Sequence, residues 1–220
     1  MGGARGRHRT ILVIGFKPFA GRRANAAGDA ADSFDGQEFN GVEIRSVLIP
    51  VEWGKPETVI KGAIEEIQRE GHQLAATLEL GECRGRTIRV EEKAHNQRAK
   101  GVADEANNRP GAEVGTEVII GGPPEYSSPL ARDVRQALQD SEIKFERSEN
   151  AGRFLCEEAF YAGMHLTSGR AKVAGPVGFV HVPRYPRGDQ DKSNPNNRKH
   201  LRRTKRSVQK ILEWLSKKNG

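Results

Sequence analysis

The chain has 220 residues, 35% of them hydrophobic and 30% charged, and its net charge is +7. A chain of this length can bury a core of its own as one domain, and two cysteines are too few for a disulfide framework. Its apolar runs are far shorter than the ~20 residues of a membrane-spanning helix, and residues 1–10 lack the apolar centre of a secretory signal. We therefore expect a cytoplasmic protein with no membrane partner.

The spacing of apolar residues predicts alternating strands and helices. The expected strands are residues 10–15, 42–51, 74–80, 87–91, 142–147 and 177–182. The expected helices are residues 56–70, 130–138, 154–166 and 201–215, and a loop after residue 15 leads into a further helix that ends near residue 32. Residues 96–124 are polar and rich in Gly and Pro, which favours a long excursion such as a hairpin arm, and residues 184–197 favour a mobile loop.

This alternation is typical of a mostly parallel, twisted sheet with helices on both faces, an α/β fold of the three-layer α/β/α sandwich type. We expect a single domain over residues 10–216, with flexible ends at residues 1–9 and 217–220. No metal site is expected, because the six histidines are not spaced as ligands with acids or cysteines.

The positive charge is concentrated near the C-terminal end. Residues 192–220 contain ten Lys or Arg and one acid, so this segment carries +9 and the rest of the chain −2. A basic segment can bind nucleic acid, but the apolar stripe of the last helix predicts an ordinary solvated face on its other side. That face would carry Arg202, Arg203, Lys205 and Arg206.

Three ionisable side chains stand where the backbone favours chemistry. Cys156 follows an Ala-Gly turn and falls in the first turn of an expected helix, where unpaired N–H groups and the helix dipole favour a thiolate. His181 lies in an apolar run at the carboxyl end of a buried strand, and Glu91 ends another strand. A structural cysteine and a hydrogen-bonded core histidine are the alternatives. Together, a thiol, an imidazole and a carboxylate are the set that thiol acyl transfer needs.

Five stretches of the chain carry motifs that occur together, in this order, in one family. Residues 15–21, followed by Asn25, are similar to GFEPFGG…N, residues 80–86 to LGQAGGR, residues 88–96 to ITVERxAxN, residues 150–156 to NTAGxFVC, and residues 179–183 to FIHVP. The chain thereby resembles the pyroglutamyl peptidase type I (pyrrolidone-carboxylate peptidase) family of cysteine peptidases from about residue 10 to residue 215.

The resemblance implies a phosphorylase/hydrolase-like fold and an omega peptidase that removes N-terminal pyroglutamate from small peptides. It implies that Cys156 is the nucleophile, that His181 is the base and later the acid, and that Glu91 orients the histidine. It also implies no cofactor, and a homotetramer as the assembly. The residues that it places at the substrate are Phe16, Phe19, Asn25, Glu82 and Phe154; plain core packing is the alternative for the phenylalanines.

Four positions depart from the family pattern near these motifs. Lys17 stands where the family has an acid, Ala20 where it has Gly, Glu82 where it has Gln, and Glu157 where it has Asn. A carboxylate at position 157 would oppose formation of the neighbouring thiolate.

Two alternative functions follow from the departures and from the charge. One is a scaffold that keeps the fold and has lost activity. The other is an RNA-associated hydrolase of related architecture, such as a peptidyl-tRNA hydrolase. Nucleic acid is not the expected partner, because the exposed face of the basic segment has no aromatic residue on which bases could stack.

Overall fold

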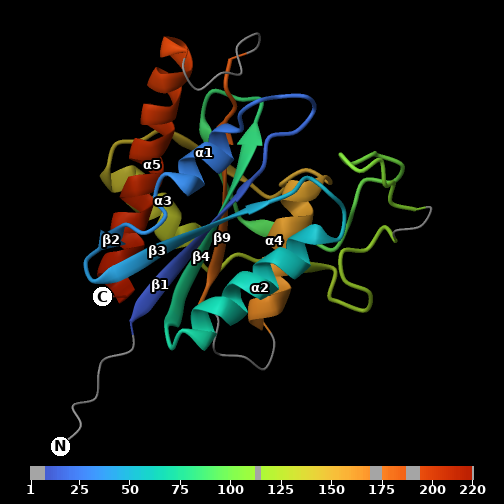
Figure 1. Cartoon of the computed structure of the whole chain (residues 1–220), viewed down its shortest axis with the longest axis horizontal. Helices are drawn as coiled ribbons and strands as arrows, with labels where there is room; N and C mark the ends of the chain where they lie inside the picture. The colour runs from blue at the N-terminus through green and yellow to red at the C-terminus, as the bar shows by residue number, and fades with distance from the viewer. Residues whose placement is uncertain (1–7, 112–114, 169–174, 187–193, 220) are drawn as a thin grey trace, which may run out of the picture.

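The computed structural model describes residues 8–111, 115–168, 175–186 and 194–219 (Figure 1). Its centre is a seven-stranded sheet with the order β2-β3-β1-β4-β9-β5-β8. The strands are β1 (Arg9–Phe16), β2 (Glu38–Phe39), β3 (Val42–Ile49), β4 (Gln73–Cys83), β5 (Ile88–Glu91), β8 (Phe145–Ser148) and β9 (Val177–Pro183).

Most neighbouring strands of this sheet are parallel. The pairs β1–β3, β1–β4, β4–β9 and β5–β8 run in the same direction, whereas β2 runs against β3 and β5 runs against β9. Parallel neighbours must be joined by crossovers, which here are the helices that the sequence predicts. The predicted mostly parallel sheet is confirmed, and β5 is the strand that reverses direction beside β9.

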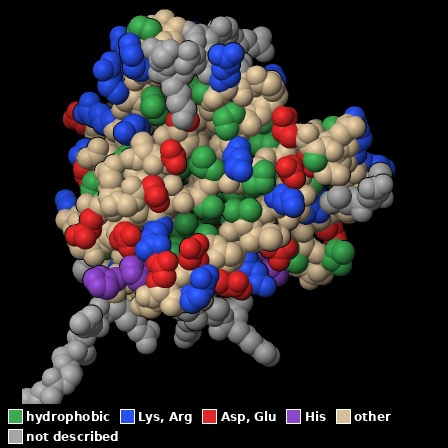
Figure 2. Space-filling model, in the orientation of Figure 1, with side chains coloured by type: hydrophobic (Ala, Val, Ile, Leu, Met, Phe, Trp, Pro, Cys, Tyr) green, Lys and Arg blue, Asp and Glu red, His purple; other side chains and the backbone are tan. Residues whose placement is uncertain are grey.

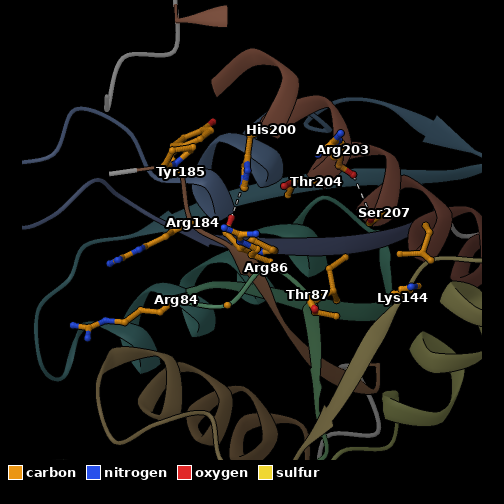
Figure 3. A pocket seen from close by; sticks show the side chains of 15 residues that line it. Arg84, Arg86, Thr87, Lys144, Arg184, Tyr185, His200, Arg203, Thr204 and Ser207 are labelled. Atoms are coloured by element: carbon orange, nitrogen blue, oxygen red, sulfur yellow. Dashed lines mark hydrogen bonds between the residues drawn. The ribbon is translucent and has the colours of Figure 1, made fainter. Parts of the chain in front are cut away.

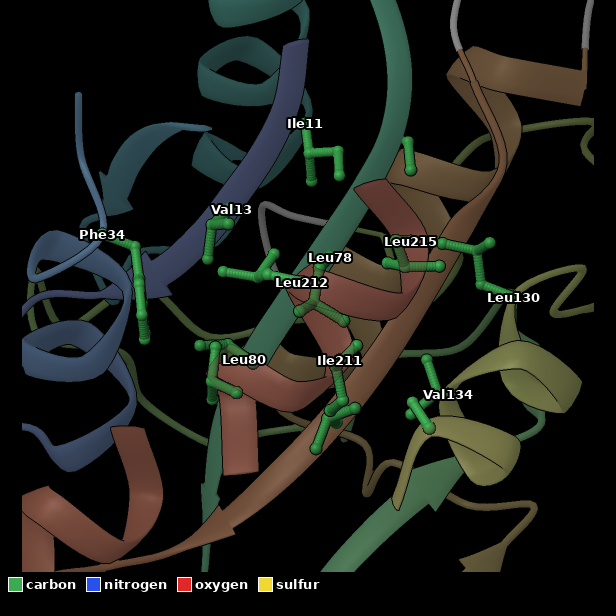
Figure 4. Packing of buried hydrophobic residues seen from close by; sticks show 14 of the residues in the cluster. Ile11, Val13, Phe34, Leu78, Leu80, Leu130, Val134, Ile211, Leu212 and Leu215 are labelled. Carbon is green, nitrogen blue, oxygen red and sulfur yellow. The ribbon is translucent and has the colours of Figure 1, made fainter. Parts of the chain in front are cut away.

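Helices cover both faces of the sheet (Figure 1). One face carries α1 (Ala26–Asp32), α3 (Ala131–Asp140) and α5 (Pro195–Asn219), and the other carries α2 (Lys55–Arg69) and α4 (Leu155–Ser168). Each face has its own apolar core. Figure 4 shows the first, in which Leu78 and Leu80 of β4 meet Leu212 and Leu215 of α5. The α/β/α sandwich is therefore confirmed.

The ends of several elements differ from the prediction. The strand expected from residue 142 begins at Phe145, because Glu142 takes a left-handed φ of 55° in the turn that closes α3. Helix α5 runs from Pro195 to Asn219, so residues 195–197 and 217–219 are helical where a loop and a flexible end were expected.

Contacts with other elements explain the length of α5. Its last turn is held by an ion pair between Lys218 and Asp133 of α3 and by a hydrogen bond from Arg9 to the Asn219 carbonyl. Arg9 itself begins β1, so residue 9 is a strand residue where a flexible start was expected. Of the expected mobile loop, residues 187–193 lie outside the described residues.

The polar excursion after β5 is framed by a second, small sheet of β6 (Lys93–His95) and β7 (Glu125–Ser127), which pair antiparallel. Between them the described residues are irregular and tied to the body rather than paired as a hairpin arm. The buried Arg98 guanidinium donates to Glu158 of α4 at 2.7 and 3.0 Å and to the Glu117 carbonyl at 2.7 Å. Asp104 accepts from the Trp53 N–H at 2.7 Å. The excursion therefore packs directly against the helix that carries Cys156.

Candidate active site

Cys156 is the second residue of α4, as the sequence predicts. The chain enters the helix through Gly152, whose φ of +88° suits glycine. Burial raises the pKa of the Cys156 thiol, and the negative charges of Glu91, Glu82 and Glu157 raise it further. At neutral pH the free sulfur therefore keeps its proton, and it needs a base to become a nucleophile.

His181 of β9 has a carboxylate partner. Its Nδ1 lies 2.7 Å from Oε1 of Glu91, and both side chains are buried. Because β5 runs against β9 with Glu91 opposite Phe179, the carboxylate is on the same sheet face as His181 and one pair away. An ionised carboxylate only accepts hydrogen bonds, so Nδ1 carries the proton and Nε2 is the basic nitrogen.

Gly81 of β4 brings the thiol and the imidazole together. A β-carbon at this glycine would lie 2.9 Å from Sγ of Cys156 and 3.0 Å from Cδ2 of His181, so both side chains approach the same point above the strand. In the described residues no hydrogen bond joins Sγ to the ring, a separation that is common in catalytic sites without substrate. The three residues predicted for catalysis thus converge from β5, β9 and α4.

The three phenylalanines predicted for the substrate belong to one apolar cluster, which also contacts Cys156. Phe16 ends β1 and is buried, whereas Phe19 and Phe154 are half-buried. The Phe154 ring meets the Trp53 ring edge-on, with centroids 5.1 Å apart. Trp53 was missed in the sequence, although a tryptophan just after the carboxyl end of a parallel strand, here β3, is a signal for such a role.

The polar side chains of Asn25 and Glu82 are engaged within the protein. Asn25 caps α1 by accepting from the Ala27 and Gly28 N–H groups. Glu82 accepts from the Ala26 N–H and from Arg22, each at 2.5 Å.

Arg22, also missed in the sequence, balances the charge of Glu82. Its guanidinium carbon lies 4.1 Å from the centre of the Phe19 ring, and its Nη1 pairs with the carboxylate. The carboxylate that replaces a family glutamine therefore has a counter-charge and faces the start of α1.

Two further carboxyl groups surround the thiol on this face of the sheet. Glu157 is buried and accepts from the His95 N–H at 2.6 Å, and burial raises its pKa to about 7. Glu79 of β4 is fully buried and has no hydrogen-bond partner among the described residues, and burial raises its pKa to about 8. Both groups therefore stay protonated to a higher pH than ordinary carboxyls, which limits the negative charge near Sγ.

Cys83 and His95 are the other thiol and imidazole near the catalytic residues in the sequence, and their surroundings differ from those of Cys156 and His181. Cys83 is buried, its thiol donates to the Thr87 carbonyl at 3.8 Å, and burial raises its pKa. His95 lies against Glu157 and Glu125. The Cys156 thiol shares the space beside Gly81 with the His181 ring, which can accept its proton, so Cys156 is the better nucleophile.

Within the described residues no helix combines the length and the apolarity that crossing a membrane requires, and no group of three His, Cys, Asp or Glu side chains could hold a metal ion. Figure 2 shows basic side chains gathered on the side of the molecule where α5 lies. In that helix Arg202, Arg203 and Arg206 are exposed and Lys205 is half-buried.

Known proteins match the chain over most of its length. A family model described as pyroglutamyl peptidase matches residues 9–211. A pyrrolidone-carboxylate peptidase of Bacillus thuringiensis is 33% identical over 181 residues, which are 81% of this chain and 80% of the relative. That of Escherichia fergusonii is 29% identical over 180 residues, with 81% and 79% covered.

Solved structures extend this similarity to the fold. The pyroglutamyl peptidase I of Bacillus amyloliquefaciens superimposes with a TM-score of 0.78 at 25% identity, covering 94% of this chain and 96% of that one. A mutant pyrrolidone carboxyl peptidase of Pyrococcus furiosus shares the fold at the same TM-score of 0.78 and 22% identity, with 95% and 99% covered.

Proposed function

The chain belongs to the pyroglutamyl peptidase family of cysteine peptidases, and we propose that it hydrolyses the amide bond after an N-terminal pyroglutamyl residue with Cys156, His181 and Glu91. The single observation that carries this assignment is the buried His181–Glu91 pair at 2.7 Å, on the same side of Gly81 as the Cys156 thiol. This geometry also favours an active enzyme over a scaffold without activity. The family match favours a peptidase over an RNA-associated hydrolase.

The first half of the reaction forms an acyl-enzyme. Nε2 of His181 takes the proton from Sγ of Cys156, and the sulfur attacks the pyroglutamyl carbonyl carbon. Glu91 stabilises the imidazolium that results. We expect backbone N–H groups at the start of α4, including that of Cys156, to bind the oxyanion. The tetrahedral intermediate collapses, and His181 gives its proton to the amine that leaves.

The second half restores the enzyme. His181 takes a proton from a water molecule, whose oxygen attacks the thioester carbonyl. Collapse of the second intermediate releases pyroglutamate, and the sulfur regains its proton from the imidazolium. No metal or cofactor takes part in this sequence, but the thiol must be kept reduced.

The apolar cluster around Cys156 suits the substrate. The lactam ring of pyroglutamate is small, flat and uncharged, and it can lie between the Phe19 and Phe154 rings, with Phe16 and Trp53 behind them. Asn25 acts on the substrate through the loop that it fixes, and Glu82 through its backbone, because their side chains are already hydrogen-bonded.

A chromogenic pyroglutamyl amide under reducing conditions tests the assignment. Wild type and Cys83→Ser are expected to release the chromophore, whereas Cys156→Ser is expected to retain less than about a thousandth of the activity. Cys83 is the matched control because it is the second thiol of the chain and ends β4, the strand that also carries Gly81. Unchanged activity of Cys156→Ser would remove Cys156 from the mechanism. An inactive wild type would favour a scaffold that has lost activity.

We also propose a cytoplasmic homotetramer whose substrates are small pyroglutamyl peptides. Family membership supports both the peptide substrates and the assembly. Light scattering on the purified chain measures the assembly directly, and a mass of one protomer would exclude the tetramer.

A further inference from the structure

A second concave site lies away from the catalytic residues. It is a cavity of about 680 Å³ between the N-terminal half of α5, the loop after β4, the segment after β9, and the turn before β8 (Figure 3). Helix α5 packs on the sheet face opposite to the one that carries Cys156 of α4. The cavity is therefore separated from the thiol by the sheet itself, although the strands that lead into it, β4 and β9, also carry Gly81 and His181.

The lining of this cavity is basic. None of its residues is acidic, and five carry a full positive charge, namely Arg84, Arg86, Lys144, Arg184 and Arg203. None of these five forms an ion pair within the described part of the chain. By contrast, Arg45, Arg98 and Arg147 of the same protein each have a carboxylate partner within 3.0 Å. Like charges around one cavity repel one another when no described carboxylate pairs with them, and an anion bound among them would relieve this repulsion.

Hydroxyl groups stand among these cations. Thr87 and Thr204 also line the cavity, and so does Ser207, whose hydroxyl donates to the Arg203 carbonyl within α5 (Figure 3). Arginine guanidinium groups bind phosphate oxygens with two parallel hydrogen bonds, and hydroxyls add single ones. The volume is that of a site for a small molecule rather than for an extended chain.

We propose that this cavity binds a compact phosphate-bearing polyanion, such as the polyphosphate group of a small molecule. A single carboxylate would leave most of the five positive charges unbalanced, whereas linked phosphate groups place several negative charges within the volume. The half-buried His200 ring, which packs 5.5 Å from the ring of the buried Tyr185, offers an aromatic surface on which a flat group attached to the phosphates can rest. The proposal does not depend on the peptidase activity.

Calorimetric titration of the purified protein with inorganic tripolyphosphate at low ionic strength tests the site. Wild type is expected to bind one equivalent in a saturable manner, and Arg184→Gln and Arg203→Gln are each expected to weaken the Kd about tenfold. Arg206→Gln is the matched control, because Arg206 is exposed on the same helix and does not line the cavity. Its Kd is expected to stay within about twofold of wild type.

Three results would overturn the proposal. The first is the absence of saturable binding to wild type. The second is an equal loss of affinity in Arg206→Gln, which would mean general attraction to a basic helix. Tighter binding of an RNA oligonucleotide or of a poly-glutamate peptide than of tripolyphosphate would mean the same. The third is a loss of binding in Cys156→Ala, which would place the anion at the catalytic site. Arg203 is exposed on a helix, so its variant keeps the fold and the test stays decisive.

Discussion

Gly81 of β4 faces Cys156 of α4 so closely that no methyl group fits between the strand and the thiol. A β-carbon on Gly81 would lie 2.9 Å from Sγ, and also 2.8 Å from the Phe179 ring. Real β-carbons do not approach other atoms so closely, because overlap at this distance is strongly repulsive. The absence of a side chain at position 81 therefore leaves the space that the Cys156 thiol occupies.

Gly81→Ala is expected to lower kcat/KM more than about 100-fold, because sulfur and imidazole must both move away from the added methyl group. Gly62→Ala in α2 is the control, since a β-carbon there meets no atom within 4 Å. Hydrolysis of a pyroglutamyl amide, with circular dichroism to check the fold, measures both. Full activity of Gly81→Ala would show that the thiol does not act where it lies.

Glu91→Gln is expected to lower kcat about 10²–10⁴-fold, because an amide can hold Nδ1 but does not stabilise the imidazolium. The neighbouring carboxylate provides the control. Glu92 pairs with Arg135 and Arg147 instead of a histidine, so Glu92→Gln is expected to keep kcat within about threefold of wild type. Equal losses in the two variants would assign Glu91 a structural role only.

Glu157→Gln is expected to change the pH profile of the reaction. The wild-type carboxyl has a pKa of about 7, so it is mostly neutral at pH 6 and mostly negative at pH 8.5, where its charge raises the pKa of the Cys156 thiol. The amide keeps the acceptor for the His95 N–H and never ionises. The ratio of variant to wild-type kcat/KM should rise from about one at pH 6 to about three to ten at pH 8.5. A ratio that does not vary with pH would contradict this account.

Glu79 is expected to limit stability at neutral pH. Its pKa of about 8 in the fold lies above the ordinary value of 4.5, so between these values the unfolded chain releases a proton that the folded chain keeps. Stability therefore falls by about 1.4 kcal/mol for each pH unit, on the order of 3 kcal/mol by pH 7. Below pH 4.5 both states are protonated and the effect vanishes.

Glu79→Leu should therefore raise the Tm most at pH 7.5 and least at pH 5, because leucine fills the same space against α4 without a polar group. Glu79→Gln separates the causes. It removes the titration but keeps a polar group in the apolar site, so its Tm should lose the same pH dependence with a smaller overall gain. Thermal unfolding from pH 4.5 to 8 measures all three proteins. A pH dependence that is the same in wild type and Glu79→Leu would refute the assignment.

The sequence predicts the layers of the fold because buried strands and amphipathic helices leave local patterns. It also predicts candidate catalytic residues, since Cys156 and His181 lie in recognisable motifs. It does not reveal that Arg22 reaches the carboxylate of Glu82, because residues sixty positions apart meet only when the sheet has formed. The burial of Glu79 is hidden for the same reason, since its environment is supplied by a helix about eighty residues later.

The polar excursion has a consequence for engineering the chain. It is mostly irregular and would be a natural target for truncation, yet it supplies the Arg98 guanidinium that neutralises Glu158, two residues after the nucleophile. Removing it would leave the buried Glu158 carboxylate without its counter-charge, which would lower the free energy of unfolding by about 3–5 kcal/mol. A shortened version must therefore replace Glu158 with a neutral side chain at the same time, or the first turns of α4 will lose their support.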